Sequence, residues 1–215
     1  MIKGLFGRFL ELFFDILYHQ GSWTYDLVAA SVSLGRWEDW IATVLPYLSG
    51  ENILELGHGP GHLQETLNQI GAYAYGLDES KYMGRLAVAN LHRAGLDHRL
   101  VTALAQELPF PNEVFQQVVS TFPTQYILAS ETLTEVFRVL EPEGSLIVLP
   151  VAWITGEAWY DRLAAGLFRI TGQAPDWDPR FMDPFIKAGF KVQMRYKYTH
   201  SSKILILEAN KSQIM

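Results

Sequence analysis

The stretch that decides the fold reads Ile53-Leu54-Glu55-Leu56-Gly57-His58-Gly59-Pro60-Gly61. Its first four residues are mostly apolar, as in parallel strands that are covered on both faces. A helical pattern follows at once over residues 62–70. Strand, tight turn and helix together form one half of a nucleotide-binding unit, so we expect a cofactor to bind at this turn.

The spacing of the glycines limits which cofactor the turn suits. Gly57, Gly59 and Gly61 allow positive φ angles and let a ligand approach without meeting a Cβ atom. The dinucleotide fingerprint G-x-G-x-x-G would need its last glycine at His62. The Glu55 carboxylate would repel a pyrophosphate but attract an ammonium group. Both features disfavour an NAD-dependent oxidoreductase.

The same residues resemble motif I of the class I S-adenosylmethionine-dependent methyltransferases, E/D-x-G-x-G-x-G. The resemblance extends over roughly residues 50–210. It implies an α/β fold with a Rossmann-like, doubly wound, seven-stranded sheet that is mostly parallel with an antiparallel last strand, plus an N-terminal helical segment. It also implies S-adenosylmethionine as the methyl donor and S-adenosylhomocysteine as the product, with the amino-acid end of the donor at this turn.

A second cofactor contact is expected where the next strand, residues 74–77, ends at Asp78. An acid about 20 residues past the glycine turn is placed to accept hydrogen bonds from two ribose hydroxyls. Asp78-Glu79-Ser80, with Met83 on the following helix, resembles the family's G-x-D-x-S…M. Ser80 also suits the N-cap of that helix.

Two acids of the family pattern are absent further along the chain. Leu104 stands where the resemblance implies an aspartate that holds the adenine amino group, shortly before the Leu-Pro-Phe-Pro of residues 108–111. Without that aspartate, a backbone carbonyl or another side chain must hold the adenine, or the adenine binds less tightly. The Ala105 N–H and the Gln106 side chain are candidates for the adenine edge. Gln116 replaces the aspartate near the start of the fourth strand.

The resemblance thus implies a cofactor site that is assembled from separate parts of the chain. Its residues are Tyr25, Glu55, Gly57, His58, Gly59, Gly61, Asp78, Glu79, Ala105, Gln106 and Thr121. Three readings of His58 stay open: contact with the methionine end, a general base, or a packed, hydrogen-bonded side chain. No residue is singled out as catalytic, because positioning alone accelerates an in-line displacement at a sulfonium.

The later elements follow the expected alternation of helices and strands. Their predicted ranges are a helix over 132–140, a strand over 145–151, a helix over 181–189 and β segments over 191–198 and 204–209. The turn over residues 138–144 resembles the family's Arg-Val-Leu-Lys-Pro-Gly-Gly. Glu143 in place of a glycine favours a type I turn without positive φ.

The composition bounds the class of protein. A chain of 215 residues with 49% hydrophobic residues fits one α/β domain, which we expect over 49–215, with a helical lid or appendage over 1–48. A formal net charge of −6 gives no general attraction to nucleic acid, so no such partner is expected. Without cysteine there are no disulfides or thiolate metal sites. The histidines and acids show no metal-ligand spacing.

The N-terminal residues 1–19 carry apolar side chains at helical spacing, with four charged side chains on the other face. This pattern predicts either an interfacial helix that contacts a membrane or a helix packed on the domain or on a twin subunit in a homodimer. No apolar run approaches the roughly 20 residues of a membrane-spanning helix. A cytoplasmic protein, with peripheral membrane contact as an option, is expected.

The sequence therefore predicts methyl transfer to a small acceptor. The N-terminal helix and the late tryptophans Trp153, Trp159 and Trp177 favour an apolar or lipid-like molecule. The alternative is a protein that binds S-adenosylmethionine without transferring its methyl group. It is motivated by Leu104 and Gln116 in place of acids.

Overall fold

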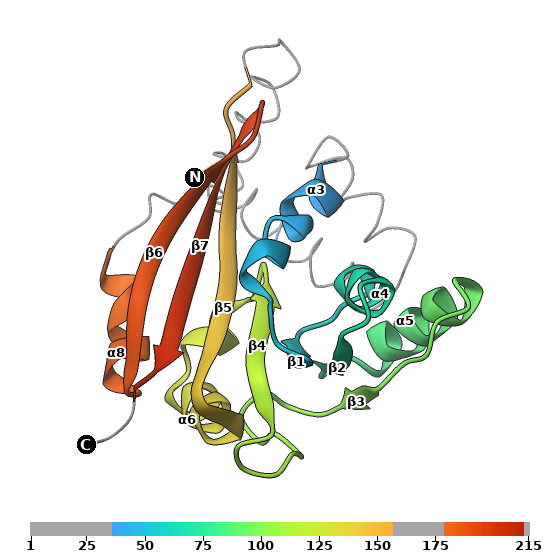
Figure 1. The fold of residues 1–215 in the computed structure, drawn as a ribbon, viewed down its shortest axis with the longest axis horizontal. Coiled ribbons are helices and arrows are strands. Elements are labelled where there is room, and N and C mark those ends of the chain that lie inside the picture. The colour runs from blue at the N-terminus through green and yellow to red at the C-terminus, as the bar shows by residue number, and fades with distance from the viewer. Residues whose placement is uncertain (1–35, 157–178, 213–215) are drawn as a thin grey trace, which may run out of the picture.

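The computed structural model of the protein describes residues 36–156 and 179–212. They form a seven-stranded sheet with the spatial order β3-β2-β1-β4-β5-β7-β6 (Figure 1). The strands are β1 (Asn52–Leu56), β2 (Tyr73–Asp78), β3 (Leu100–Thr102), β4 (Phe115–Thr121), β5 (Leu140–Ile154), β6 (Phe190–Tyr198) and β7 (Ser202–Lys211). The expectations for residues 1–19, Tyr25, Trp159 and Trp177 lie outside the described residues.

The strand directions make β1 the centre of a parallel unit. It pairs in parallel with β2 on one side and β4 on the other, and β5 continues in parallel beside β4. Strand β7 runs antiparallel to both of its neighbours, β5 and β6. The apolar side chains of β4 and β5 are buried on both faces, as parallel strands between helices require. The predicted mostly parallel sheet with an antiparallel last strand is confirmed.

Helices cover both faces of the sheet (Figure 1). The described helices are α3 (Trp37–Ala42), α4 (His62–Gln69), α5 (Lys81–Arg93), α6 (Ser130–Val139) and α8 (Asp183–Lys187), with 3₁₀ turns η1 (Leu45–Tyr47), η2 (Gln125–Leu128) and η3 (Pro179–Met182). Trp40 and Leu67 of α3 and α4 pack on one face. Ile127, Leu133 and Phe185 of η2, α6 and α8 pack on the other. The result is a doubly wound α/β layer structure.

The segment before β1 is anchored in the core of the sheet. The indole of Trp40 is buried, and its Nε1–H donates to Ser202 Oγ of β7 at 2.9 Å. Val44 and Leu48 pack in the same cluster. The predicted division of the chain at residue 48 stays a prediction.

Two glutamines hold the chain where it enters β1. Gln117 Oε1 accepts hydrogen bonds from the backbone N–H groups of Ser49 and Gly50, at 2.7 and 2.8 Å. Gln116 Oε1 accepts from Glu51 N at 2.5 Å. Both lie at the amino end of β4, the end opposite to Thr121. Gln116 therefore replaces an acid at a place where a neutral oxygen accepts hydrogen bonds from the backbone N–H groups of Glu51 and Asn52.

One turn differs from its prediction. Glu143 has a positive φ of 67°, whereas the sequence favoured a type I turn without one. The register gives the reason, because Leu140 pairs with Phe115 and Ser145 already pairs with Gln117. Residues 141–144 thus have only Gln116 of β4 opposite them, so the backbone bulges outward there, and Glu143 takes the left-handed conformation. Strand β5 is correspondingly longer than the predicted 145–151.

We expect Trp40→Phe to lower the free energy of unfolding by about 2 kcal/mol, because it removes the indole donor and leaves the buried Ser202 hydroxyl without it. Denaturant titration measures this. The Ser202→Ala substitution should cost less in the Trp40→Phe background than in the wild-type protein. Equal costs in the two backgrounds would contradict the proposed coupling between α3 and β7.

Candidate cofactor-binding site

The glycine turn is fixed against the end of β2. The backbone N–H groups of Gly57 and His58 donate to Leu77 O at 2.7 and 3.3 Å. Gly57 and Gly61 have φ angles of 72° and 93°, in the left-handed region that favours glycine. A Cβ at Gly61 would lie 3.1 Å from Ala87 Cβ, so the third glycine also permits the close approach of α5.

Asp78 joins the glycine turn to the start of α5. Its Oδ2 accepts a hydrogen bond from Gly59 N at 2.9 Å, and its Oδ1 accepts one from Ser80 N at 2.8 Å. The Ser80 hydroxyl accepts from Met83 N at 3.2 Å. The structure therefore assigns Ser80 the N-cap, and the Asp78 carboxylate holds the ends of β1 and β2 in one arrangement.

A pocket lies at the carboxyl ends of β1, β2 and β4, the crevice in which open α/β sheets bind ligands. The structure brings seven of the predicted residues together in its lining: Gly57, Gly59, Asp78, Glu79, Ala105, Gln106 and Thr121. The sequence did not place Leu77 and Ala103 in the site, although Ala103 directly follows the end of β3. Phe122, Pro123 and Thr124 also line the pocket, just beyond the end of β4.

Glu55 lies beneath the glycine turn and outside the pocket lining. Its side chain is buried, and Oε2 accepts a hydrogen bond from Gln64 Nε2 at 2.8 Å. Burial raises the pKa of Glu55 from 4.5 to about 8, the nearby Asp78 charge adds to the rise, and the Gln64 hydrogen bond opposes it. At neutral pH Glu55 is therefore mainly protonated, which removes the charge that would attract an ammonium group.

His58 is buried and does not line the pocket. Its Nδ1 lies 2.8 Å from Gly59 O, so the neutral ring donates from Nδ1. Burial lowers the pKa of His58 below its ordinary value, against the opposing charge of Asp78. A Cβ at Gly76 would lie 3.0 Å from the His58 ring. Of the three readings, this geometry favours the packed, hydrogen-bonded histidine.

An aromatic wall forms the side of the pocket after β4. Phe122 has a positive φ of 49°, which is uncommon for a bulky residue and typical of functional sites. Its ring stacks on Trp37 of α3 with centroids 4.3 Å apart. The Tyr126 hydroxyl donates to Leu56 O at 3.1 Å and lies 2.9 Å from Ser120 Oγ. A Cβ at Gly57 would meet that hydroxyl at 2.7 Å, so the first glycine also makes room for Tyr126.

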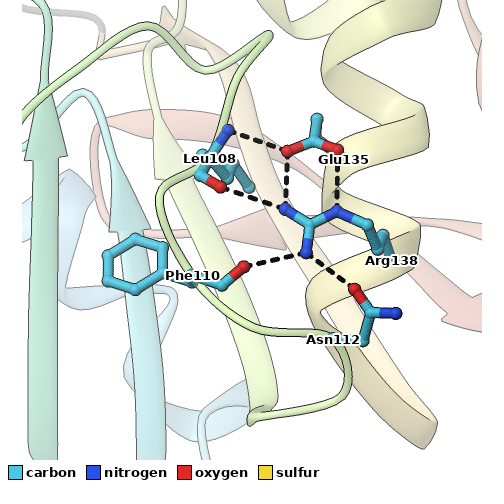
Figure 2. Close-up of polar contacts among 5 residues, drawn as sticks. All are labelled: Leu108, Phe110, Asn112, Glu135 and Arg138. Atoms are coloured by element: carbon cyan, nitrogen blue, oxygen red, sulfur yellow. Dashed lines mark hydrogen bonds and ion pairs between the residues drawn. The ribbon is translucent and has the colours of Figure 1, made fainter.

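The stretch that carries Ala105 and Gln106 is tied down by Arg138 of α6. Figure 2 shows the Arg138 guanidinium donating to Leu108 O at 3.0 Å, to Phe110 O at 2.8 Å and to Asn112 Oδ1 at 2.9 Å. It also pairs with the Glu135 carboxylate, which in turn accepts a hydrogen bond from Leu108 N (Figure 2). This network fixes the loop on which the predicted adenine-edge residues lie.

Leu104, at the position of the missing family acid, is 49% exposed and does not line the pocket. The acceptor for an adenine amino group must therefore come from another residue. Ala105 and Gln106 both line the pocket, Ala105 buried and Gln106 half-buried. The side-chain oxygen of Gln106 is one acceptor that this loop offers, besides its backbone carbonyls.

The lining fits S-adenosylmethionine. Each Asp78 oxygen accepts one backbone hydrogen bond and can accept another, which leaves capacity for two ribose hydroxyls. Leu77, Met83 and Ala105 offer apolar contacts for a flat base. A Cβ at Gly59 would meet nothing within 4 Å, so open space lies beside the turn.

No cluster of three or more His, Asp or Glu side chains in the described parts of the chain could hold a metal ion. Over the same residues, no helix is long and apolar enough to cross a bilayer.

Gly61 caps α4 rather than lining the pocket.

The sequence is similar to known methyltransferases. Residues 54–148 match the family model described as a methyltransferase domain. The demethylmenaquinone methyltransferase of Thermobifida fusca is 33% identical over 132 residues, which are 58% of this chain and 55% of the relative. The chain thus spans little more than half the length of that relative.

Solved structures share the fold. An S-adenosylmethionine-dependent methyltransferase from Methanosarcina mazei aligns with a TM-score of 0.56 and 21% identity, over 79% of this chain and 97% of that chain. The phosphoethanolamine N-methyltransferase 2 of Haemonchus contortus, in complex with S-adenosyl-L-methionine, aligns with a TM-score of 0.60 and 15% identity, over 83% and 53%. At these identities the likeness concerns the fold alone.

The raised pKa of Glu55 has a consequence for stability. The folded protein keeps the proton up to a pKa of about 8, whereas the unfolded chain loses it near 4.5. The contribution of this group to stability is therefore complete below the unfolded pKa and is lost as the pH rises through the folded pKa.

We expect Glu55→Gln to raise the free energy of unfolding by about 2 kcal/mol near pH 7, because a neutral amide avoids the cost of keeping a buried carboxyl protonated. The gain should vanish below the unfolded pKa of Glu55. Denaturant titrations over a pH series measure it. A variant with the same pH dependence as the wild-type protein would show that Glu55 is ionised in the fold.

We expect Arg138→Ala to lower the free energy of unfolding by about 2 kcal/mol, because Leu108 O, Phe110 O and the Glu135 carboxylate lose their donor. Arg93→Ala on the exposed face of α5 is the matched control, with an expected loss of at most about 0.5 kcal/mol. Equal losses in the two variants, measured by denaturant titration, would refute the anchoring role of Arg138.

Proposed function

We propose that the chain is a class I S-adenosylmethionine-dependent methyltransferase and that it transfers a methyl group from S-adenosylmethionine to a small aromatic acceptor of the quinone type. The observation that carries the transfer is the pocket in which the glycine turn and Asp78 meet at the carboxyl ends of β1 and β2. Relatives named as demethylmenaquinone methyltransferases support the class of acceptor.

In this proposal the donor lies across the ends of β1 and β2. Asp78 accepts hydrogen bonds from the two ribose hydroxyls, and Glu79 lies beside it in the lining. Ala105 and Gln106 contact the adenine edge. Gly57, Gly59 and Thr121 surround the methionine end. Glu55, His58 and Gly61 support the turn from below, and Tyr25 remains a predicted contact of the N-terminal segment.

The proposed transfer depends more on the positioning of donor and acceptor than on a proton acceptor in the protein. Bound S-adenosylmethionine supplies a methyl group on a sulfonium, which is already activated for in-line displacement. The residues of the chain then hold the acceptor in line with that methyl group at near-attack distance. We assign no general base, because Asp78 and Tyr126 are engaged in hydrogen bonds and His58 lies outside the lining.

The aromatic wall supports a flat acceptor. Phe122, Pro123 and Tyr126 line the pocket beside Thr121. Aromatic rings favour offset stacking or edge contacts with another ring. Since the Trp37 stack holds the Phe122 ring in place, this wall is preorganised before a ligand binds.

Three further expectations belong to the proposal. Residues 1–48 form a segment that closes over the site of a catalytic domain at 49–215. Residues 1–19 contact either a membrane or the protein itself. A homodimer remains a prediction of the same amphipathic pattern.

The test is calorimetric titration with S-adenosylmethionine and S-adenosylhomocysteine, followed by a transfer assay with a demethylated quinol. We expect Asp78→Asn to weaken adenosyl-ligand binding at least about tenfold, because it removes a charge-assisted acceptor. Asp97→Asn, at an exposed loop acid, should leave binding unchanged.

The outcomes separate the parts of the proposal. Tight cofactor binding without transfer to any quinol would overturn the acceptor and favour a protein that binds the cofactor without transferase activity. No binding of either adenosyl ligand by folded protein would overturn the function as a whole.

A further inference from the structure

The charge of the chain is unevenly distributed. Residues 180–203 contain six Lys and Arg side chains and one acid, a formal charge of +5 in a chain of −6. The remaining residues therefore carry −11. This basic segment forms η3, α8 and β6 at one end of the sheet (Figure 1). The charge of this segment would attract an anionic partner.

The same segment holds most of the exposed apolar side chains. Eight large hydrophobic residues are exposed in the described parts of the chain, and five of them form what we call the apolar patch: Phe181, Ile186, Met194, Tyr196 and Tyr198. Ile186 is 55% exposed and Tyr198 is 68% exposed. Such clustering on one edge distinguishes a contact surface from scattered surface hydrophobics.

Strand β6 carries both properties at the sheet edge, on its two alternate faces. Met194, Tyr196 and Tyr198 alternate with basic or polar residues, so they share one face of the strand. They are opposite Leu207, Leu205 and Lys203 of β7. The two leucines pack in the same cluster as Phe185 of α8. Met194, Tyr196 and Tyr198 therefore lie on the face of the sheet against which α8 packs.

Four lysines lie in the same segment: Lys187 in α8, Lys191 and Lys197 on the other face of β6, and Lys203 in β7 opposite Tyr198. None of them forms an ion pair with a carboxylate within the described residues. Lys203 Nζ instead lies 4.0 Å from the ring centroid of Tyr196 and 5.4 Å from that of Trp153. A lysine between aromatic rings keeps its charge available to an anion while its stem packs on apolar surface.

We propose that this α8–β6 edge docks on the surface of an anionic lipid bilayer. Lysines near a membrane surface are attracted to acidic headgroups, and Tyr, Phe and aliphatic side chains enter the boundary with the acyl chains. Tyrosine is typical of that boundary. The site shares no residue with the lining of the cofactor pocket, so it is tested without reference to the proposed transfer.

Two other partners fit the observations less well. In a second copy paired along β6, Lys191, Arg195 and Lys197 would face the same charges of its mate. Single-stranded RNA would match the lysines and tyrosines, but it has no apolar surface to contact Ile186 and Met194. Lysines on an edge strand also discourage pairing with another strand. That role would account for the lysines but not for the exposed Ile186 and Tyr198.

The orientation of β6 relates this surface to the pocket. Strand β6 runs antiparallel to β7, and β7 runs antiparallel to β5, so β6 is parallel to β5 and β4. Tyr198 therefore lies at the same end of the sheet as Thr121 and the pocket. A bilayer along this edge would present its surface to the pocket end of the sheet.

The test is co-flotation of the full chain with vesicles of equimolar phosphatidylcholine and phosphatidylglycerol, or of phosphatidylcholine alone. The wild-type protein should float with the anionic vesicles and be released by high salt. Lys187→Glu/Lys191→Glu/Lys197→Glu should weaken partitioning at least about tenfold, and Ile186→Ser/Tyr198→Ser at least about threefold. Lys81→Glu/Arg85→Glu/Arg93→Glu on α5 makes the same charge change elsewhere and should keep binding within about twofold.

Several results would overturn the assignment: no flotation of the wild-type protein, equal losses in the α5 control, or unchanged flotation of the lysine variant. Binding of a fluorescent oligouridylate that the lysine variant loses, without lipid binding, would assign the edge to RNA instead. Calorimetric binding of S-adenosylhomocysteine by the lysine variant, unchanged from the wild type, shows that the variant is folded.

Discussion

The two backbone hydrogen bonds accepted by the Asp78 carboxylate are the constraint on which the site depends. One comes from Gly59 after β1 and the other from Ser80 before α5. Strand β1 lies between β2 and β4, and the chain goes from β1 to β2 first and reaches β4 only after β3. The connections after β1 and β4 therefore diverge, and a crevice opens between the carboxyl ends of these two strands. Asp78 fixes the geometry of that crevice before any ligand enters it.

Around this constraint, polar groups divide into those that hold the backbone and those that face the pocket. Glu55 and His58 are buried below the turn and held neutral at pH 7 by burial. Arg138 binds the backbone of the loop between β3 and β4, and Gln117 binds the backbone just before β1. The pocket itself is left with Asp78 and Glu79 as acids. A cationic donor would therefore meet negative charge only at the end of β2.

The sequence predicted the fold and the centre of the site better than it predicted the roles of single residues. Strand directions and the positions of Gly57 and Asp78 follow from short local patterns, because parallel strands and glycine turns leave clear signatures. Whether Glu55 faces the ligand depends on Gln64, which lies nine residues away on α4. The Phe122 wall depends on Trp37, far away in sequence. Such contacts are set by tertiary packing and leave no local pattern.

The central claim is that the glycine turn and Asp78 form a binding site for S-adenosyl ligands. Nuclear magnetic resonance of ¹⁵N-labelled protein titrated with S-adenosylhomocysteine tests it most directly, since each glycine amide reports its own surroundings. The amides of Gly57 and Gly59 should shift with the ligand, while those of Gly95 and Gly189, outside the pocket lining, stay in place. Shifts confined to other residues, with Gly57 and Gly59 unmoved, would contradict the assignment of the site.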